Sequence, residues 1–231
     1  AQQFNIDRAD QDQFALASQQ RTATAQAQGF FTHEIIPVNI PQRKDDPIVV
    51  DTDEHPRAST TLEALAKLKP VVTAEGTVTA GNASGINDGA AAVLIASEAA
   101  IEQYQLKPRA KIIASTAVGV EPRIMGFAPA PAIKKLLKQA NLTLEQMDVI
   151  ELNEAFAAQA LAVTRDLGLA DDTTQVNPNG GAIAIGHPLG ASGARLVTTA
   201  LNQLEQTGGT YALCSMCIGV GQGIAMIIQR V

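Results

Sequence analysis

The chain has 231 residues, of which 46% are hydrophobic and only 3% aromatic, and its formal net charge is −6. This length is enough for one large or two small domains, and the absence of Trp predicts a core of Ala, Val, Ile and Leu. No basic run is present, which argues against nucleic-acid binding, and no apolar run reaches the roughly 18–20 residues that a membrane-spanning helix needs.

The first half of the chain predicts helices that are separated by irregular segments. A helix at 5–28 has Asp7 as its expected N-cap. Pro37 and Pro41 exclude a central strand, so residues 33–41 are expected to form an edge strand. The other elements expected here are an exposed charged excursion at 41–60 with a short strand at 48–50, a helix at 62–68 capped by Thr60 or Thr61, a small-residue loop at 76–90 and an apolar helix at 90–100.

In the second half, apolar strands alternate with helices. This pattern predicts a layered α/β domain with a mixed sheet of five strands. The expected strands are 111–118, 147–152, 175–177, 210–217 and 223–231, and the expected helices are 130–139, 154–167 and 193–206.

The stretch from Asn177 to Gly193, NPNGGAIAIGHPLGASG, lies between a predicted strand and a predicted helix. Its glycines allow the backbone to approach a ligand, and the helix start behind it presents unpaired N–H groups. His187, between Gly186 and Pro188, can donate a hydrogen bond or move a proton near neutral pH. The alternative is a loop histidine that satisfies a local carbonyl group, but the glycine-dense surroundings favour a functional role.

Asn153 and Glu154 directly follow the predicted buried strand at 147–152. Asn153 could simply cap the next helix. However, ligands and catalytic groups collect at the carboxyl ends of strands in α/β sheets, where an Asn can hold a water or a carbonyl group.

Cys214 and Cys217 form a C-x-x-C pattern between two predicted strands. A redox motif of this kind belongs at a helix N-terminus, and a zinc site needs two further ligands, so both interpretations carry little weight. Cys214 fits a buried apolar position, whereas Cys217 enters the turn at Gly219, where converging N–H groups could stabilise an oxyanion. Two cysteines do not make a disulfide scaffold, so we expect a cytoplasmic protein.

Several segments together resemble the signatures of the thiolase family, and the likeness runs over essentially all 231 residues. The resemblance implies the thiolase-like layered fold, α-β-α-β-α in the complete enzyme. Residues 50–70 and 211–231 are most similar to members that act on β-ketoadipyl-CoA (3-oxoadipyl-CoA) in aromatic-acid breakdown. The matching segments are NEAFAAQ (153–159), NPNGGAIAIGHPLGASGAR (177–195), CIGVGQGIAM (217–226), GTVTAGNASGINDGAAA (76–92) and VGVEPRIMG (118–126).

The resemblance implies an acyl-CoA C-acyltransferase. Thiolases cleave a 3-oxoacyl-CoA with CoA, or run the reverse Claisen condensation. The expected substrate is 3-oxoadipyl-CoA, which is cleaved to acetyl-CoA and a shortened acyl-CoA. Coenzyme A and acetyl-CoA are expected as substrates, and neither a permanently bound cofactor nor a metal ion is expected.

The resemblance also assigns roles to residues of this chain. Cys217 is the expected general acid/base at the α-carbon of the acetyl group, and neighbouring dipoles would have to stabilise its thiolate. His187 is expected to activate the nucleophilic cysteine and to help form an oxyanion hole, and Asn153 to orient the water that completes the hole. The other implied contacts are the backbone N–H of Gly219 in a second oxyanion hole, Ser84 on the pantetheine arm of CoA, and Met125 and Phe156 along the tunnel for that arm.

One departure from the family concerns its nucleophilic cysteine, which neither Cys214 nor Cys217 matches. We therefore expect an N-terminally incomplete chain that is inactive alone and that pairs with an N-terminal thiolase segment carrying this cysteine. A homo-oligomer, dimer or tetramer, is also implied. The expected domains are the C-terminal part of the loop domain at 1–84, the closing segment of the N-terminal half at 85–108 and the C-terminal thiolase domain at 109–231.

Two alternatives remain open, an acetoacetyl-CoA thiolase and a non-catalytic CoA-binding fragment. The set of His187, Asn153 and Cys217 favours catalysis, because a binding module does not need acid/base groups. A dicarboxylic acyl group would favour a basic side chain near the pocket. The candidates for this side chain are Arg43, Arg57 and Arg123, each of which can also be a solvated surface charge.

Overall fold

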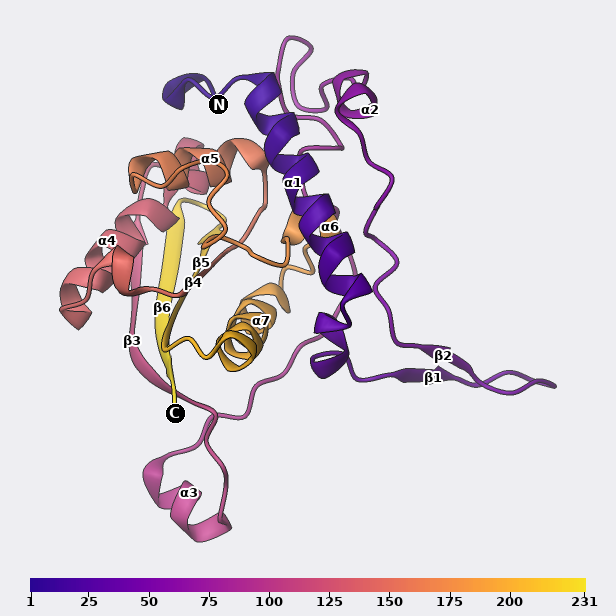
Figure 1. Cartoon of the computed structure of the whole chain (residues 1–231). Helices are drawn as coiled ribbons and strands as arrows, with labels where there is room; N and C mark the ends of the chain where they lie inside the picture. The colour runs from indigo at the N-terminus through magenta and orange to yellow at the C-terminus, as the bar shows by residue number, and fades with distance from the viewer.

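The computed structural model describes residues 1–231, and its centre is a four-stranded mixed sheet (Figure 1). The strands lie in the order β3 (Ala110–Gly119), β6 (Gln222–Arg230), β5 (Tyr211–Ile218) and β4 (Val149–Leu152). β6 runs antiparallel to β3 and β5, whereas β4 runs parallel to β5. Helices pack on both faces of this sheet, which confirms the predicted layered α/β class.

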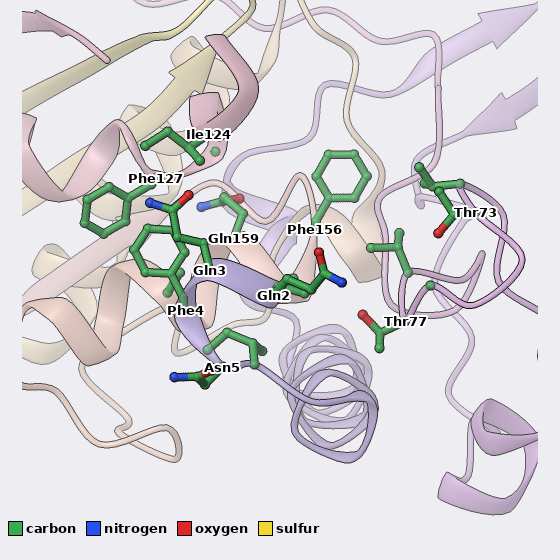
Figure 2. Close-up of a pocket in the computed structure, with 18 of the residues that line it drawn as sticks. Gln2, Gln3, Phe4, Asn5, Thr73, Thr77, Ile124, Phe127, Phe156 and Gln159 are labelled. Carbon is green, nitrogen blue, oxygen red and sulfur yellow. The ribbon is translucent and has the colours of Figure 1, made fainter. Parts of the chain in front are cut away.

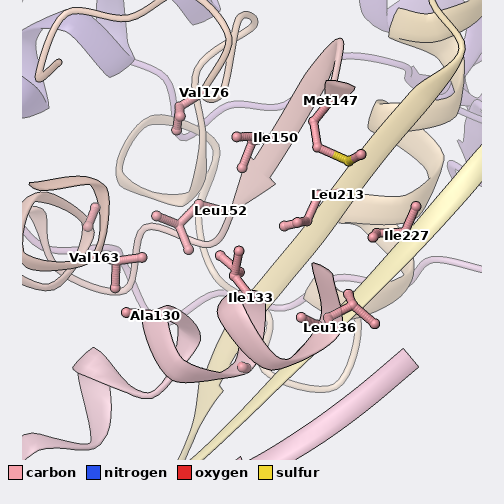
Figure 3. Packing of buried hydrophobic residues seen from close by; sticks show 13 residues of the cluster. Ala130, Ile133, Leu136, Met147, Ile150, Leu152, Val163, Val176, Leu213 and Ile227 are labelled. Carbon is pink, nitrogen blue, oxygen red and sulfur yellow. The ribbon is translucent and has the colours of Figure 1, made fainter. Parts of the chain in front are cut away.

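One face of the sheet is covered by α4 (Pro129–Ala140) and α5 (Ala157–Asp166). α4 begins at Pro129, where the missing N–H would have had no helical partner, and it ends before Asn141, which adopts φ 52°. Burial of each large aliphatic side chain in this layer contributes about 1.5–3 kcal/mol. The large members of this cluster are Ile133, Leu136, Met147, Ile150, Leu152, Val163, Leu213 and Ile227 (Figure 3).

The opposite face is covered by α7 (Ser192–Thr207). Leu196, Ala200 and Leu204 recur every four residues and form one buried stripe of this helix. Val149 and Ile150 are neighbours on β4 whose side chains point to opposite faces, so Val149 packs against α7 and Ile150 against α4.

The sheet has four strands, so the expected fifth strand at 175–177 was wrong. Residue Val176 contributes only an isolated parallel bridge to Ile150. Asn177 adopts φ 46° and is followed by Pro178, which stops the ladder. The Asn177 side chain replaces the missing ladder bonds with two bonds to Leu152. Its Oδ1 accepts the backbone N–H of Leu152, and its Nδ2 donates to the carbonyl oxygen of Leu152, both at 2.8 Å.

The long helix α1 (Arg8–Ala27) packs against α5 and the short α6 (Ala182–Ile185) (Figure 1). Asp7 caps α1 as predicted, and its carboxylate accepts a backbone N–H of the first turn at 2.8 Å. Leu16 and Ile183 share a buried cluster between α1 and α6. α1 therefore braces the segment that leads to His187.

The excursion after α1 contains a small antiparallel hairpin that extends away from the sheet (Figure 1). Its strands are β1 (Val38–Ile40), shorter than the predicted 33–41, and β2 (Ile48–Val50), as predicted. α2 (Leu62–Ala66) follows and is capped by Thr61. Short 3-10 helices occupy Gln2–Phe4, Phe30–His33, Pro122–Phe127 and Leu144–Gln146.

The predicted apolar helix at 90–100 was wrong. Residues 90–97 have no regular structure, and α3 (Glu98–Tyr104) starts only after the cap Ser97. The side chains of Leu94 and Ile95 are 84% and 71% exposed, so no packed surface stabilises a helix here. Most helical stability in proteins comes from such packing rather than from intrinsic propensity.

Candidate active site

Asn153 and His187 meet at the edge of the sheet where β4 and β5 end. The backbone N–H of Asn153 continues the pairing of the two strands by donating to the carbonyl oxygen of Ser215 at 3.0 Å. Its side-chain Nδ2 then lies 3.3 Å from Nε2 of His187, and both side chains are buried. Asn153 Oδ1 has no hydrogen-bond partner within the chain, so it can accept a bond from another group. α5 begins only after Phe156, so Asn153 is not its cap.

The glycine-dense segment positions His187 through contacts with a second loop. Gly186 adopts φ 92°, and a Cβ there would lie 2.4 Å from Oδ1 of Asn87, so this position requires glycine. Asn87 Oδ1 accepts the backbone N–H of His187 at 3.1 Å. The loop at 76–90 therefore meets the stretch at 177–193, and Asn87 is a contact that the sequence did not predict.

The imidazole of His187 is held on its other side by Ser192. Ser192 Oγ lies 2.6 Å from His187 Nδ1, at the start of α7. Burial lowers the pKa of His187, and the positive charge of Arg195 lowers it further. The imidazole is thus held neutral near pH 7, which suits a hydrogen-bond partner or a general base. Ser192 was not predicted either, although its spacing five residues after the histidine was visible in the sequence.

Glu154 supports the segment that carries His187. Its buried Oε2 accepts the hydroxyl of Ser18 at 2.6 Å and the backbone N–H of Ile183 at 3.2 Å, and its Oε1 accepts the amide of Asn177 at 2.8 Å. A Cβ on Gly181 would lie 2.5 Å from this carboxyl group. Burial raises the pKa of Glu154. One carboxylate thus connects α1, the end of the β4 ladder and the start of α6.

Cys217 lies near the end of β5, two residues beyond the Ser215 carbonyl that Asn153 binds. No hydrogen bond joins its thiol to Asn153 or His187. Burial raises the pKa of Cys217, whereas a bond to its own backbone N–H lowers it. Burial therefore favours the protonated thiol, and the N–H contact is the one that favours the thiolate. Gly219 begins the exposed turn after β5, and nothing lies within 4 Å of a Cβ added there.

Cys214 belongs to the buried core, as predicted. It lies in the cluster under α7, and its Sγ is 3.6 Å from the carbonyl oxygen of Leu196. Burial raises its pKa strongly.

A cleft of about 1510 Å³ is lined by Met125 and Phe156 but not by Asn153, His187 or Cys217 (Figure 2). Ser84 does not line it, and its hydroxyl donates to the carbonyl oxygen of Ala155, the residue before Phe156, at 3.2 Å. Gln159 projects against the cleft, and neither of its buried amide atoms has a partner. This side chain was not predicted from the sequence.

Of the arginines considered for an acyl carboxylate, only Arg123 lines the cleft, where it contacts Glu121 at 3.4 Å and Gln3 at 3.1 Å. Arg43 and Arg57 lie on the exposed surface away from it. No His, Cys, Asp and Glu side chains gather in a group that could hold a metal ion. None of the helices has the length and hydropathy that crossing a membrane requires.

Two family models match the chain. The model described as the thiolase C-terminal domain matches residues 106–230, and that of the thiolase N-terminal domain matches residues 1–99. Together they account for nearly the whole length.

Individual relatives agree with these matches. The chain is 83% identical, over its whole length, to 58% of a beta-ketoadipyl-CoA thiolase from Acinetobacter baylyi. Among solved structures, it is similar to the acetyl-CoA acetyltransferase of Bacillus anthracis, with a TM-score of 0.95, 43% identity and coverage of 100% of this chain and 58% of that one. Human mitochondrial 3-ketoacyl-CoA thiolase in complex with CoA gives a TM-score of 0.90 and 45% identity over 100% of this chain and 57% of that one. The chain thus spans little more than half the length of the relatives it matches.

Proposed function

The chain belongs to the thiolase family, and we propose from this that the protein of which these residues are part is an acyl-CoA C-acyltransferase. It would cleave a 3-oxoacyl-CoA with CoA, or form one by the reverse Claisen condensation. The observation that carries the proposal is the pair of His187 and Asn153, which lie 3.3 Å apart at the end of β4. Coenzyme A and acetyl-CoA would act as substrates.

In the proposed cleavage, a cysteine outside these residues attacks the C3 carbonyl of the substrate, and His187 takes its proton. The C2–C3 bond breaks, the acyl group stays on that cysteine, and the electron pair moves to C2. Cys217 then donates its thiol proton to C2 and releases acetyl-CoA. The raised pKa of Cys217 supports this role, because a protonated thiol is the form that an acid needs.

Transfer of the acyl group to CoA completes the proposed cycle. The thiol of CoA loses its proton to the Cys217 thiolate and attacks the thioester, and the departing cysteine thiolate recovers the proton held on His187. Both acid/base groups thereby return to their starting states. A water held by Asn153 Oδ1, together with His187, would stabilise one oxyanion, and the N–H of Gly219 would stabilise the other. The unpaired Oδ1 of Asn153 supports the first of these assignments.

We propose that the cleft lined by Met125 and Phe156 receives the pantetheine arm, with Ser84 at its side. Residues 1–84 would be the end of a loop domain, 85–108 the closing segment of an N-terminal half and 109–231 the C-terminal domain. The missing nucleophile would come from an N-terminal thiolase segment, and the whole protein would form a homo-oligomer in the cytoplasm.

For the acyl group we propose 3-oxoadipyl-CoA, because the beta-ketoadipyl-CoA thiolase of A. baylyi is 83% identical to this chain. Arg123 at the cleft is the basic side chain that could meet the distal carboxylate. The test compares thiolysis of 3-oxoadipyl-CoA and acetoacetyl-CoA by the full-length protein. We expect a higher kcat/KM for 3-oxoadipyl-CoA. A higher value for acetoacetyl-CoA would support an acetyl-CoA acetyltransferase, the activity named for the B. anthracis relative.

A further inference from the structure

Ser192 is the only side chain that binds the Nδ1 atom of His187, and neither the sequence motifs nor the proposed reaction assigns it a role. Its Oγ lies 2.6 Å from Nδ1 and also 3.0 Å from the carbonyl oxygen of Pro188. Ser192 is 2% exposed, so water does not compete for these bonds. The direction of the two bonds decides which nitrogen of His187 carries the proton.

A serine hydroxyl has one proton, and the Pro188 carbonyl oxygen can only accept it. When Ser192 donates to Pro188, its oxygen must accept from His187, which places the imidazole proton on Nδ1. Nε2 is then an acceptor and matches Nδ2 of Asn153, which can only donate. The opposite tautomer would set two N–H groups against each other across the 3.3 Å contact and would remove the Ser192 bond to Pro188.

We propose that Ser192 is a positioning residue that keeps His187 in the tautomer with its proton on Nδ1. Nε2 is then the atom that takes the thiol proton, once its contact with Asn153 Nδ2 opens. The inference rests on the proposed function for its kinetic consequence, but not for the tautomer itself. The second bond, from Ser192 to Pro188, fixes the orientation of the hydroxyl. The carbonyl oxygen of Pro188 thus orients the Ser192 hydroxyl, and Ser192 in turn holds the imidazole of His187.

The variant Ser192→Ala tests this inference in the full-length protein. Without the Ser192 acceptor, the preference for the Nδ1–H tautomer is weakened, because only the contact of Nε2 with Asn153 Nδ2 still favours it. We expect the rate of acetylation by acetyl-CoA to fall about 10- to 100-fold, while the dissociation constant for acetyl-CoA stays within about twofold. Ser192→Thr keeps a hydroxyl and should recover most of the rate.

Thr198→Ala is the matched control. Thr198 lies on the same helix and donates to the carbonyl oxygen of Ala194 at 3.0 Å, as Ser192 does to Pro188, but it does not contact His187. Its loss should leave the acetylation rate unchanged. Melting temperatures of all variants separate a general loss of stability from a specific effect on the histidine.

A spectroscopic measurement keeps the inference testable whatever the activity. Solid-state NMR of protein labelled with ¹⁵N-histidine, with His187 identified by its loss in His187→Gln, reports which ring nitrogen is protonated. We expect protonated Nδ1 and bare Nε2 in the wild type, and a shift toward the other tautomer in Ser192→Ala. A wild-type Nε2–H signal would overturn the inference. So would normal acetylation of a folded Ser192→Ala variant, whereas absence of acetylation in the wild type, with the expected tautomer, would overturn the proposed function alone.

Discussion

At the scale of single residues, Glu154 is a buried carboxylate that accepts hydrogen bonds from Ser18, Asn177 and Ile183. All three partners donate, so both side-chain oxygens of Glu154 are needed as acceptors. A glutamine in its place would turn one NH₂ group toward a donor. Because Glu154 is buried, water cannot reach the two facing donors and accept their hydrogen bonds.

We therefore predict that Glu154→Gln destabilises the protein by about 1–3 kcal/mol and loosens the segment from Gly181 to His187. Denaturant unfolding would measure the first effect, and amide hydrogen exchange of that segment the second. Glu205→Gln is the control, since Glu205 forms an exposed ion pair with Arg109. Equal exchange of the segment in both variants would contradict this prediction.

The sequence predicted the two side chains that meet at the strand ends, His187 and Asn153, because their motifs and flanking elements mark them. It did not predict Ser192 or Asn87 as partners of His187. These contacts depend on how Gly186 turns the chain and on how two loops distant in sequence come together. The burial that raises the pKa of Cys217 was not predicted either, since it depends on the packing around β5.

At the scale of secondary-structure elements, a hydrogen bond from Arg195 to Glu151 joins α7 to β4. Arg195 Nη1 lies 2.9 Å from Oε2 of Glu151, whose side chain is 0% exposed. Burial raises the pKa of Glu151 from 4.5 to about 7, although Arg195 opposes this shift. Burial also raises the pKa values of Glu34, Asp53 and Glu154.

The raised pKa of Glu151 sets the sign of the pH dependence of stability. The native state keeps the Glu151 proton between pH 4.5 and about 7, where the unfolded state has lost it. The native state therefore binds more protons, and stability falls as pH rises through this window. The full shift of the Glu151 pKa corresponds to a loss on the order of 3 kcal/mol in the free energy of unfolding above this window. His187 acts in the opposite direction, since its lowered pKa makes stability rise as pH approaches 6.5.

We predict that Glu151→Gln reduces the fall in melting temperature between pH about 5 and about 7.5, because the carboxyl that loses its proton there is gone. Glu121→Gln, which removes an exposed carboxyl from a 3.4 Å contact with Arg123, should follow the wild type. Parallel curves for Glu151→Gln and wild type would show that Glu151 does not titrate in this window.

Among the elements, those with clear periodicity or capping residues were predicted well, as α1, α4 and α7 illustrate. The failures have physical causes. Residues 90–97 are apolar enough for a helix but lack a surface to pack on. The expected strand at 175–177 is cut short by the backbone of Asn177, whose side chain takes over the pairing.

At the scale of the whole molecule, several large apolar side chains lie on the surface. Monomeric proteins rarely leave contiguous apolar patches open. Such patches mark surfaces that other parts of a protein, or other subunits, cover. The most exposed of these side chains are Ile36, Ile86, Leu94, Ile95, Leu189 and Val220.

We predict that the full-length protein is a dimer or tetramer, because its resemblance to the thiolase family implies this state. Light scattering coupled to size-exclusion chromatography would measure the mass. Replacing Val38 and Val49 of the exposed hairpin by Thr, which keeps the β-branched shape, would test whether the hairpin takes part. A monomeric mass for the unmodified protein would contradict the prediction.

The most direct test of the proposed mechanism separates the work of His187 from that of Cys217. Full-length Cys217→Ser and His187→Ala would each be incubated with radiolabelled acetyl-CoA, and the label retained on the denatured protein counted. If Cys217 only moves the α-proton, Cys217→Ser should retain label yet fail to make or break the carbon–carbon bond. His187→Ala should retain little, because it lacks the base that activates the thiol, and it also loses an oxyanion donor worth about 10²–10³ in rate. Normal labelling of His187→Ala would show that another residue activates the nucleophilic thiol and would contradict the central role of His187.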